Sequence, residues 1–245
     1  MVQFTSQKMI GRVVGLWRYP VKSMGAEALE DVDVSWFGLA GDRRWAFVRE
    51  DSIQSGFPWL TIRERSDMQH YLPTLVDPAR PDQSPALVRT PAGKVMDIGD
   101  PNLGSALYPR GVRVIKQNRG IFDTFPLSLI TTQTIASLGK RVGTQLDVQR
   151  FRPNFLVEAS DGNPYPEDSW VGRVLRIGSL RFRVDKRDGR CAVITVDPLT
   201  AARNAQVLRT VVNERQGCLG VYGTVVEPGK LALDDPVFME TPGGP

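Results

Sequence analysis

The sequence predicts a mostly β protein with a barrel-like fold and a few short helices. Its apolar residues tend to alternate with polar ones over short stretches that glycine or proline interrupts, which is typical of strands with one buried face. Apolar residues recur at helical spacing in few segments, and each of these is short. At 245 residues the chain can bury a large core, either as one domain or as two lobes that share an interface.

The first half of the chain is predicted to be rich in strands. One strand runs into a turn marked by proline, two more are hinged at residues 38–42, and a hairpin surrounds residues 91–93. Val32, Val34 and Trp36 alternate with polar residues, so we expect them to share one buried face. The expected segments are residues 11–23, 29–50 and 86–99.

The second half is predicted to combine strands with two short helices. One helix should run from Thr131 or Thr132 to about Leu138, because a threonine hydroxyl can accept bonds from first-turn amides, and Gly139 should end it. Apolar residues at helical spacing predict the second helix over residues 204–215. The remaining segments are expected to be strands: residues 147–159 with a bend at Pro153, 174–186, 190–197 and 218–240.

The composition excludes several classes of protein. No apolar run approaches the ~20 residues that span a bilayer, and the N-terminal segment lacks the pattern of an export signal, so we expect a cytoplasmic protein without membrane contact. One histidine and two cysteines without a CxxC pair are too few for zinc-finger, iron–sulfur or multi-histidine sites. Cys191 and Cys218 are expected to be free thiols in a reducing compartment.

Arginine dominates the basic residues: it accounts for 24 of the 31 lysines and arginines, and the formal net charge is +4. A guanidinium group can bind phosphate or carboxylate at two points, so one interpretation is an anionic small-molecule ligand. The other, which composition alone favours, is that the arginines lie on ordinary solvated faces. Because they are scattered and not clustered with aromatic residues, nucleic acid is not an expected partner.

The segment "RDGRCAVITVDPLT" places a cysteine between arginines and an apolar stretch. A thiolate is a soft ligand for a transition metal, and Lys186, Arg187 and Arg190 could lower the pKa of the Cys191 thiol. From this segment alone, a buried structural cysteine on a strand is the favoured interpretation. Cys218 has no comparable basic neighbours, and we expect it to be buried.

Four polar residues lie beside turns, where side chains can point into open space. Lys22 in "YPVKS", Arg43 in "GDRRW", and Arg152 with Asn154 in "RFRPNFLV" could together hold a phosphate and a polar heterocycle. Taken singly, each is better interpreted as a solvated charge or a turn residue. His70 is interpreted as a surface or core histidine and not as a catalytic base.

These segments, in this order, carry a resemblance to a known family. "YPVKS", "GDRRW", "FRPN", "EDSW", "GRCAVITVDPLT" and "LGVYG" together resemble the molybdenum cofactor sulfurase C-terminal (MOSC) family, over roughly residues 10–240. The likeness is greatest to two-lobed members that reduce amidoximes. It implies two interlocked lobes: an N-terminal β-barrel-like lobe over residues 1–110 and a cofactor-binding MOSC domain over residues 111–245.

The resemblance also implies a cofactor and a reaction. Molybdenum would be held by the dithiolene of molybdopterin, in the form without a nucleotide, and by the thiolate of Cys191 as the catalytic and metal-binding residue. It would cycle between Mo(VI) and Mo(IV) and reduce amidoximes, hydroxylamines or N-hydroxylated bases, with electrons from a separate flavin, iron–sulfur or haem protein. Asp185 or Asp188 could relay protons. The cofactor would be held by Lys22, Ser23, Arg43, Thr131, Arg152, Asn154, Arg190 and Tyr222.

Two departures from the family pattern and three alternatives stay open. Gly189 stands where amidoxime-reducing members often have serine, and "PLTAA" replaces the usual Thr-Gly after the Asp-Pro turn. The chain could instead bind or hand on sulfurated cofactor without reducing anything, or carry a metal-free persulfide on Cys191. A hydrolase dyad of Cys191 and His70 ranks below both, because nothing in the sequence places the two side chains together.

Overall fold

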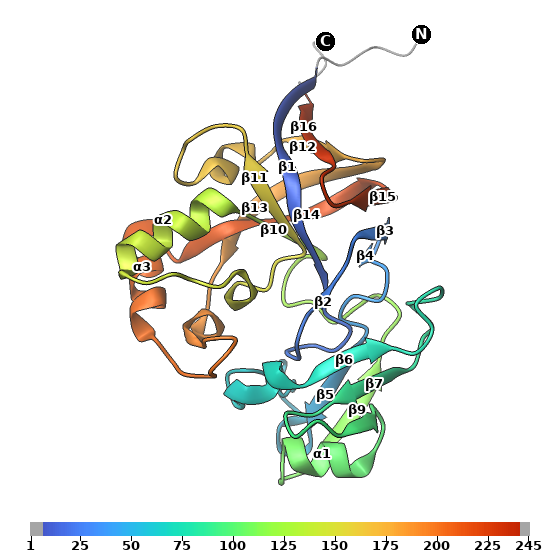
Figure 1. The fold of residues 1–245 in the computed structure, drawn as a ribbon. Helices are drawn as coiled ribbons and strands as arrows, with labels where there is room; N and C mark the ends of the chain where they lie inside the picture. Colours follow the sequence, from blue (N-terminus) through green and yellow to red (C-terminus); the bar gives the residue numbers. More distant parts are fainter. Residues whose placement is uncertain (1–6, 241–245) are drawn as a thin grey trace.

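The computed structural model describes residues 7–240, which form a larger lobe of long strands and a smaller lobe with its own short sheets (Figure 1). The outer limits of the two predicted lobes, residues 1 and 245, lie outside the described residues. Between residues 7 and 240, no helix is both long and apolar enough to cross a lipid bilayer.

Seven strands of the larger lobe close into a barrel. In ring order they are β1 (Gln7–Arg18), β11 (Phe155–Ala159), β10 (Leu127–Thr131), β14 (Cys218–Glu227), β13 (Leu180–Gly189), β12 (Val174–Ile177) and β16 (Pro236–Glu240). β1 pairs with β11 on one side and with β16 on the other, so the sheet returns to its first strand. Only β10 and β11 run parallel within this ring. The prediction of a mostly β, barrel-like fold is confirmed.

Alternate residues of each strand fill the barrel interior. Along β13, Leu180, Phe182 and Val184 are buried, whereas Arg183 between them is exposed. The ring of Phe182 meets that of Phe155 edge to face, with 6.1 Å between the ring centres. A strand repeats every two residues, so the alternation that is visible in the sequence is the same one that packs this core.

The smaller lobe packs two sheets and one helix around a separate core. Its elements are β5 (Trp45–Arg49), β9 (Val112–Lys116), β6 (Leu72–Leu75), β7 (Ala86–Arg89), β8 (Val95–Asp97), α1 (Pro101–Leu107) and the 3₁₀ turns η1 (Glu50–Ser52) and η2 (Ser66–His70). β5 pairs with β9, and β6, β7 and β8 form a three-stranded sheet. Phe47, Leu60 and Met68 lie in the core between them.

The two lobes share strands, so they interlock. β2 (Glu27–Ala28) pairs with the end of β1, and β15 (Gly229–Ala232) pairs with β3 (Asp31–Ser35), which continues to β4 (Gly38–Leu39). Strands from the start of the chain therefore lie in the same sheets as strands from its end. The boundary between residues 110 and 111 stays a prediction.

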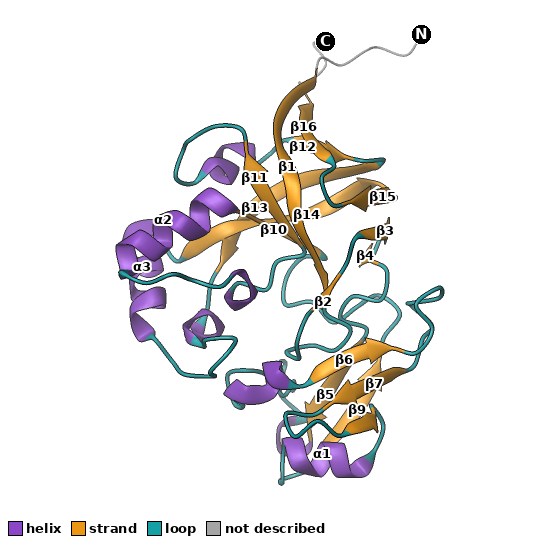
Figure 2. Ribbon diagram, in the orientation of Figure 1, coloured by secondary structure: helices purple, strands orange, loops and turns teal. Residues whose placement is uncertain are grey.

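Helices gather on one side of the barrel (Figure 2). They are α2 (Thr132–Val142), α3 (Ala205–Arg215) and the 3₁₀ turns η3 (Val148–Arg150), η4 (Pro166–Trp170) and η5 (Ala192–Thr195). Leu138, Ile194, Val207 and Leu219 belong to the core that these elements share with the barrel wall. The two predicted α-helices are confirmed, each with a side-chain cap at its start.

Three expected element limits differ from the structure. α2 continues past Gly139 to Val142, because the left-handed residue that ends it is Gly143, with φ of +76°. The strand expected over residues 147–159 begins only at Phe155, after η3 and a left-handed residue. The segment 190–197 is not a strand.

A 3₁₀ turn, η5, occupies half of that last segment in place of the expected strand. Thr195 Oγ1 donates to the carbonyl of Ala192 at 2.7 Å, a local bond that favours a turn. The Arg150 guanidinium donates to the carbonyls of Ile194 and Thr195 at 3.2 and 3.1 Å, so no neighbouring strand is needed to satisfy them. The prediction of a buried Trp36 is also wrong: it lies in the turn between β3 and β4 and is 61% exposed.

Candidate functional site

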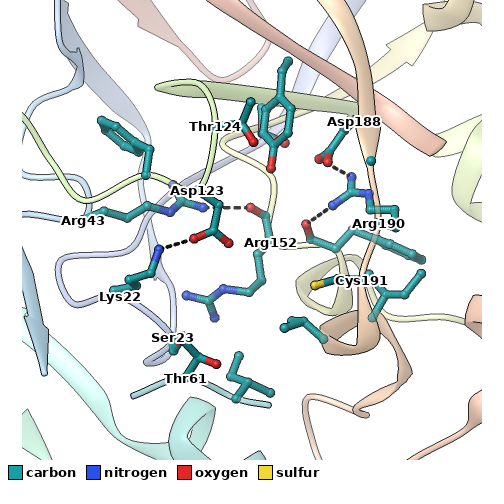
Figure 3. A pocket seen from close by; sticks show the side chains of 18 of the residues that line it. Lys22, Ser23, Arg43, Thr61, Asp123, Thr124, Arg152, Asp188, Arg190 and Cys191 are labelled. Carbon is teal, nitrogen blue, oxygen red and sulfur yellow. Dashed lines mark hydrogen bonds and ion pairs between the residues drawn. The ribbon is translucent and has the colours of Figure 1, made fainter. Parts of the chain in front are cut away.

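A polar cavity of about 270 Å³ lies where the two lobes meet. Turns of the smaller lobe, the loop 122–125 and the ends of barrel strands all contribute to its wall (Figure 3). Eight of the nine predicted site residues line it, and they are Lys22, Ser23, Arg43, Arg152, Asn154, Arg190, Cys191 and Tyr222. Segments that are far apart in sequence therefore converge on one space.

Thr131 is the predicted site residue that does not line this cavity. It is fully buried and caps α2, where its Oγ1 accepts from the amide of Thr134 at 3.2 Å. The same hydroxyl donates to Glu167 Oε2 at 2.8 Å, and burial raises the pKa of that carboxyl above its usual value. Thr131 thus fixes the start of a helix whose preceding strand, β10, contributes Ser128 to the cavity.

Three residues of the cavity wall adopt the left-handed backbone region that favours glycine. They are Ser23, Arg43 and Arg152, with φ of +67°, +50° and +52°. Each such residue costs about 1–2 kcal/mol relative to ordinary backbone. Strain of this kind is commonly found at binding sites, and here it turns three polar residues toward the same space.

The buried carboxylate of Asp42 holds two of these turns together. Its Oδ1 accepts from the amide of Tyr19 at 2.8 Å, and its Oδ2 accepts from the Arg43 guanidinium and from Asn154 Nδ2, the latter at 3.2 Å. Asn154 Nδ2 also donates to the carbonyl of Trp17 at 3.2 Å. The side-chain amide of Asn154 therefore joins the walls of the cavity, and both of its donors are already used.

Among residues 7–240, the guanidinium of Arg152 forms no ion pair with a carboxylate, although it lies in the cavity. Its buried Nη2 atom has no hydrogen-bond partner among residues 7–240. Its central carbon lies 4.3 Å from the centre of the Tyr19 ring, and that of Arg43 lies 4.6 Å from the same ring. Burial, and then the neighbouring Arg43, lowers the pKa of Arg152 to about 10. A cation held in this way is a ready partner for an anionic ligand.

Lys22 also contributes positive charge, but it has a partner. Its Nζ atom donates to the carbonyl of Ile121 at 3.1 Å and to Asp123 Oδ1 at 2.5 Å. Burial lowers the pKa of Lys22. Burial alone would raise the pKa of Asp123, but the Lys22 ammonium holds it below its usual value. Asp123 comes from a loop that sequence reasoning did not single out.

Cys191 is a half-buried free thiol at the start of η5. Its Sγ atom accepts a hydrogen bond from Arg63 Nη2 at 3.3 Å. The three cations expected to approach it are directed elsewhere. Lys186 Nζ lies over the Phe125 ring, 5.4 Å from its centre, and Arg187 donates to the carbonyl of Arg215. Arg190 donates to the carbonyls of Leu219 and Phe151 at 2.7 and 2.9 Å. The nearby cation thus comes from the smaller lobe and carries no local sequence signal.

The structure separates the two aspartates that were considered for proton relay. Asp188 lines the cavity, is 1% exposed and lies 2.9 Å from Arg190 Nη2. Burial raises its pKa to about 6. Asp185 instead accepts from Arg183 at 2.6 Å and from Thr224 at 2.8 Å, outside the cavity lining. Of these two aspartates, Asp188 is the one that lines this space.

The remaining candidates do not enter the cavity. His70 Nε2 lies 3.1 Å from the carbonyl oxygen of Pro198, and the cavity lining that includes Cys191 does not include His70. Cys218 is a free thiol and half-buried, not fully buried as expected. Within the described part of the chain, no cluster of three or more His, Cys, Asp or Glu residues could hold a metal ion. A metal at Cys191 would therefore need ligands from a bound cofactor.

Two family models match the chain, and each covers a range of residues that contributes to the cavity. The model described as "MOSC N-terminal beta barrel domain" matches residues 10–91, and the model described as "MOSC domain" matches residues 116–238. Every residue that lines the cavity falls within one of these two ranges.

Individual proteins that resemble the chain do so at low identity. The human "Mitochondrial amidoxime reducing component 2" is 23% identical, over 94% of this chain and 84% of that protein. The "Molybdenum cofactor sulfurase" of Drosophila mojavensis is 25% identical over 90% of this chain, which spans 33% of that protein. The crystal structure of the YUAD protein from Bacillus subtilis is similar in fold, with a TM-score of 0.53 at 12% identity over 98% of this chain and 100% of that one.

Proposed function

The chain belongs to the MOSC family, and on that premise we propose that it is a molybdenum cofactor-dependent oxidoreductase that reduces N-hydroxylated compounds. The substrates would be amidoximes, hydroxylamines or N-hydroxylated bases, and the electrons would come from a separate flavin, iron–sulfur or haem protein. The observation that carries the proposal is one cavity that combines a half-buried thiol with an arginine whose buried Nη2 has no hydrogen-bond partner among the described residues. The two relatives named above support it, because one is named an amidoxime reducing component and the other a molybdenum cofactor sulfurase.

The residues of the cavity fit a phosphorylated pterin that brings its own metal ligands. Arg152 Nη2 is a buried donor that bonds to no described residue. A phosphate oxygen could accept a hydrogen bond from it. Arg43 lies beside it on the same tyrosine ring, and arginine pairs bind phosphate well because their donors are fixed in a planar fork. Cys191 supplies the one protein sulfur, and its thiolate is a suitable ligand for a transition metal.

We propose a division of roles among the predicted residues. Cys191 would bind molybdenum. The phosphate and pterin would contact the side chains of Lys22, Ser23, Arg43, Arg152, Arg190 and Tyr222. Asn154 and Thr131 would support them through hydrogen bonds to neighbouring residues. The cofactor would be the pterin form without a nucleotide. Gly189 would leave open space beside that cofactor, because a Cβ added at Gly189 would meet no atom within 4 Å.

When bound, this cofactor supplies a two-electron centre at which an N–OH group, with two electrons and two protons, becomes N–H and water. The chain would orient the substrate, tune the centre and deliver protons. Asp188 is the residue placed to do the last, since its buried carboxyl faces the cavity and is partly protonated near pH 6.

A carrier of sulfurated cofactor without reductase activity is the second candidate. The similarity to a molybdenum cofactor sulfurase over 90% of this chain favours it. The two candidates differ in turnover. If the protein is a reductase, a sample shown to contain molybdenum should convert an aromatic amidoxime to the amidine when a reduced dye supplies the electrons. A Cys218→Ala variant should do so equally well, and a Cys191→Ala variant should not. Loaded wild-type protein that turns over no N-hydroxylated compound would favour the carrier.

A further inference from the structure

The hydrogen bond to the Cys191 sulfur crosses from one lobe to the other. Arg63 follows β5 in the smaller lobe, whereas Cys191 follows β13 of the barrel. Arg63 Nη2 donates to Cys191 Sγ at 3.3 Å, and the Arg63 side chain is 33% exposed, at the edge of the cavity. Figure 3 shows the thiol of Cys191 on the side of the cavity that faces Thr61, two residues before Arg63.

Several contacts fix where the Arg63 guanidinium lies. Its central carbon is 4.9 Å from the centre of the Phe57 ring, which supports one face of the planar group. The turn that carries it is closed by Glu64, whose Oε2 accepts from the amide and the hydroxyl of Thr61 at 2.9 and 2.7 Å. Asp123 is 4.0 Å away, too far for a hydrogen bond. The best geometry for an Arg63 N–H is therefore toward the sulfur.

A second arginine ties this turn to the barrel lobe. Arg203 Nη2 donates to the backbone carbonyls of Ile62 and Arg63 at 3.2 and 3.0 Å. Arg203 is itself bridged to Val196, just after η5, the turn that begins at Cys191. The donor and the sulfur are thus held by the same short stretch of the barrel lobe, one directly and the other through Arg203.

We infer that Arg63 is a positioning residue that hydrogen-bonds the metal-binding sulfur of Cys191 and raises the reduction potential of the molybdenum. This rests on the proposed function, since it takes Cys191 to be the ligand. A hydrogen bond and a positive charge at a thiolate ligand draw electron density from the sulfur, so the reduced metal is stabilised relative to the oxidised metal. Arg63 also couples the potential to the packing of the two lobes, because the donor and the ligand belong to different ones.

The test uses full-length protein and measures the metal itself. Wild type, Arg63→Met and Arg63→Lys would be assayed for molybdenum per chain and then titrated with redox mediators while EPR follows the metal. Arg63→Met should shift the midpoint to a more negative value, so that the ratio of oxidised to reduced metal at the wild-type midpoint rises about tenfold. Arg63→Lys should recover part of the shift. Arg203→Met should produce a smaller shift of the same sign.

The control is Arg89→Met, which removes an exposed arginine from β7 outside the cavity and should leave the midpoint unchanged. If Arg63→Met fails to load, Arg63→Gln is measured in its place, because it keeps a polar side chain but removes the charge. Loaded variants with the wild-type midpoint would overturn the role of Arg63 and leave the proposed function intact. Wild-type protein without molybdenum would overturn both.

Discussion

The Arg152 guanidinium stacks on the ring of Tyr19 at 4.3 Å, and its buried Nη2 finds no hydrogen-bond acceptor among the described residues. Burial of a cation without an anion is unfavourable, and the stacking offsets only part of that cost. The same residue has left-handed backbone. The buried charge and the left-handed backbone of Arg152 are both energetically unfavourable, as expected of a residue on the cavity wall that binds an anionic ligand.

Replacement of Arg152 by methionine should reduce cofactor binding far more than folding. Loss of the stacking costs about 0.5–1 kcal/mol and relief of the buried charge offsets it, so the free energy of unfolding of cofactor-free protein should change by less than about 1 kcal/mol. Molybdenum per chain should fall at least about tenfold, since a charge-assisted bond to phosphate is lost. Urea unfolding and metal analysis measure the two effects.

Arg176→Met is the matched control, because Arg176 stacks on Phe238 at 4.5 Å but does not line the cavity. It should lose a similar amount of stacking energy and keep its metal. Equal metal loss in both variants would mean that Arg152 acts through stability and not through binding.

Asp188 should make stability depend on pH in the opposite sense to an aspartate whose pKa is lowered by folding, because burial outweighs its ion pair with Arg190. Burial raises its pKa to about 6, whereas an aspartate of the unfolded chain titrates near ~3.9. The folded state therefore binds the proton more tightly, so this contribution is present below pH ~4 and is lost as pH rises through about 6. Between pH 4.5 and 7, the free energy of unfolding of Asp188→Asn should rise by about 2 kcal/mol relative to that of wild type.

Urea unfolding of both proteins at the two pH values measures this gain. Asp185→Asn is the control, since Asp185 lies outside the cavity lining and has partners in Arg183 and Thr224. A stability difference between wild type and Asp188→Asn that is the same at both pH values would show that Asp188 is not protonated in this range.

Thr131→Val tests whether this residue acts on the cofactor directly. The variant loses the cap of α2 and the bond to Glu167, which should lower the free energy of unfolding by about 1–2 kcal/mol. Because Thr131 does not line the cavity, molybdenum per chain should stay near the wild-type value when the protein is folded. Strong metal loss with little change in stability would instead indicate direct contact.

The sequence predicts the barrel well because a strand repeats its burial every two residues. Residues 174–186 alternate around Gly178, and the structure has β12 and β13 there as a hairpin. The same rule fails where local bonds decide the backbone: "RCAVITVD" has the composition of a strand, but Thr195 and Arg150 bind its carbonyls and η5 forms. β-branched residues indicate a strand only where no such bond competes.

A residue of the candidate site can be predicted from the sequence only when it belongs to one of the segments that carry the family resemblance. The structure brings eight of the nine predicted site residues to the cavity, but the turn at residues 61–63 and the loop 122–125 also line it and were not predicted to do so. Arg63 and Asp123 carry no such signal, because their roles depend on contacts with Cys191 and Lys22, more than 90 residues away in each case. Pairings of that range follow from how the lobes interlock, and the sequence pattern of a single segment contains no information on them.

The most direct test of the account is the molybdenum content of purified protein from a host that makes the pterin form of the cofactor. Wild type and Cys218→Ala should contain close to one molybdenum per chain, and Cys191→Ala should contain almost none, because Cys191 is the one thiol in the cavity lining. A Cys191→Ala variant that holds as much metal as wild type would contradict the account. So would wild-type protein without metal from a host that loads a known relative.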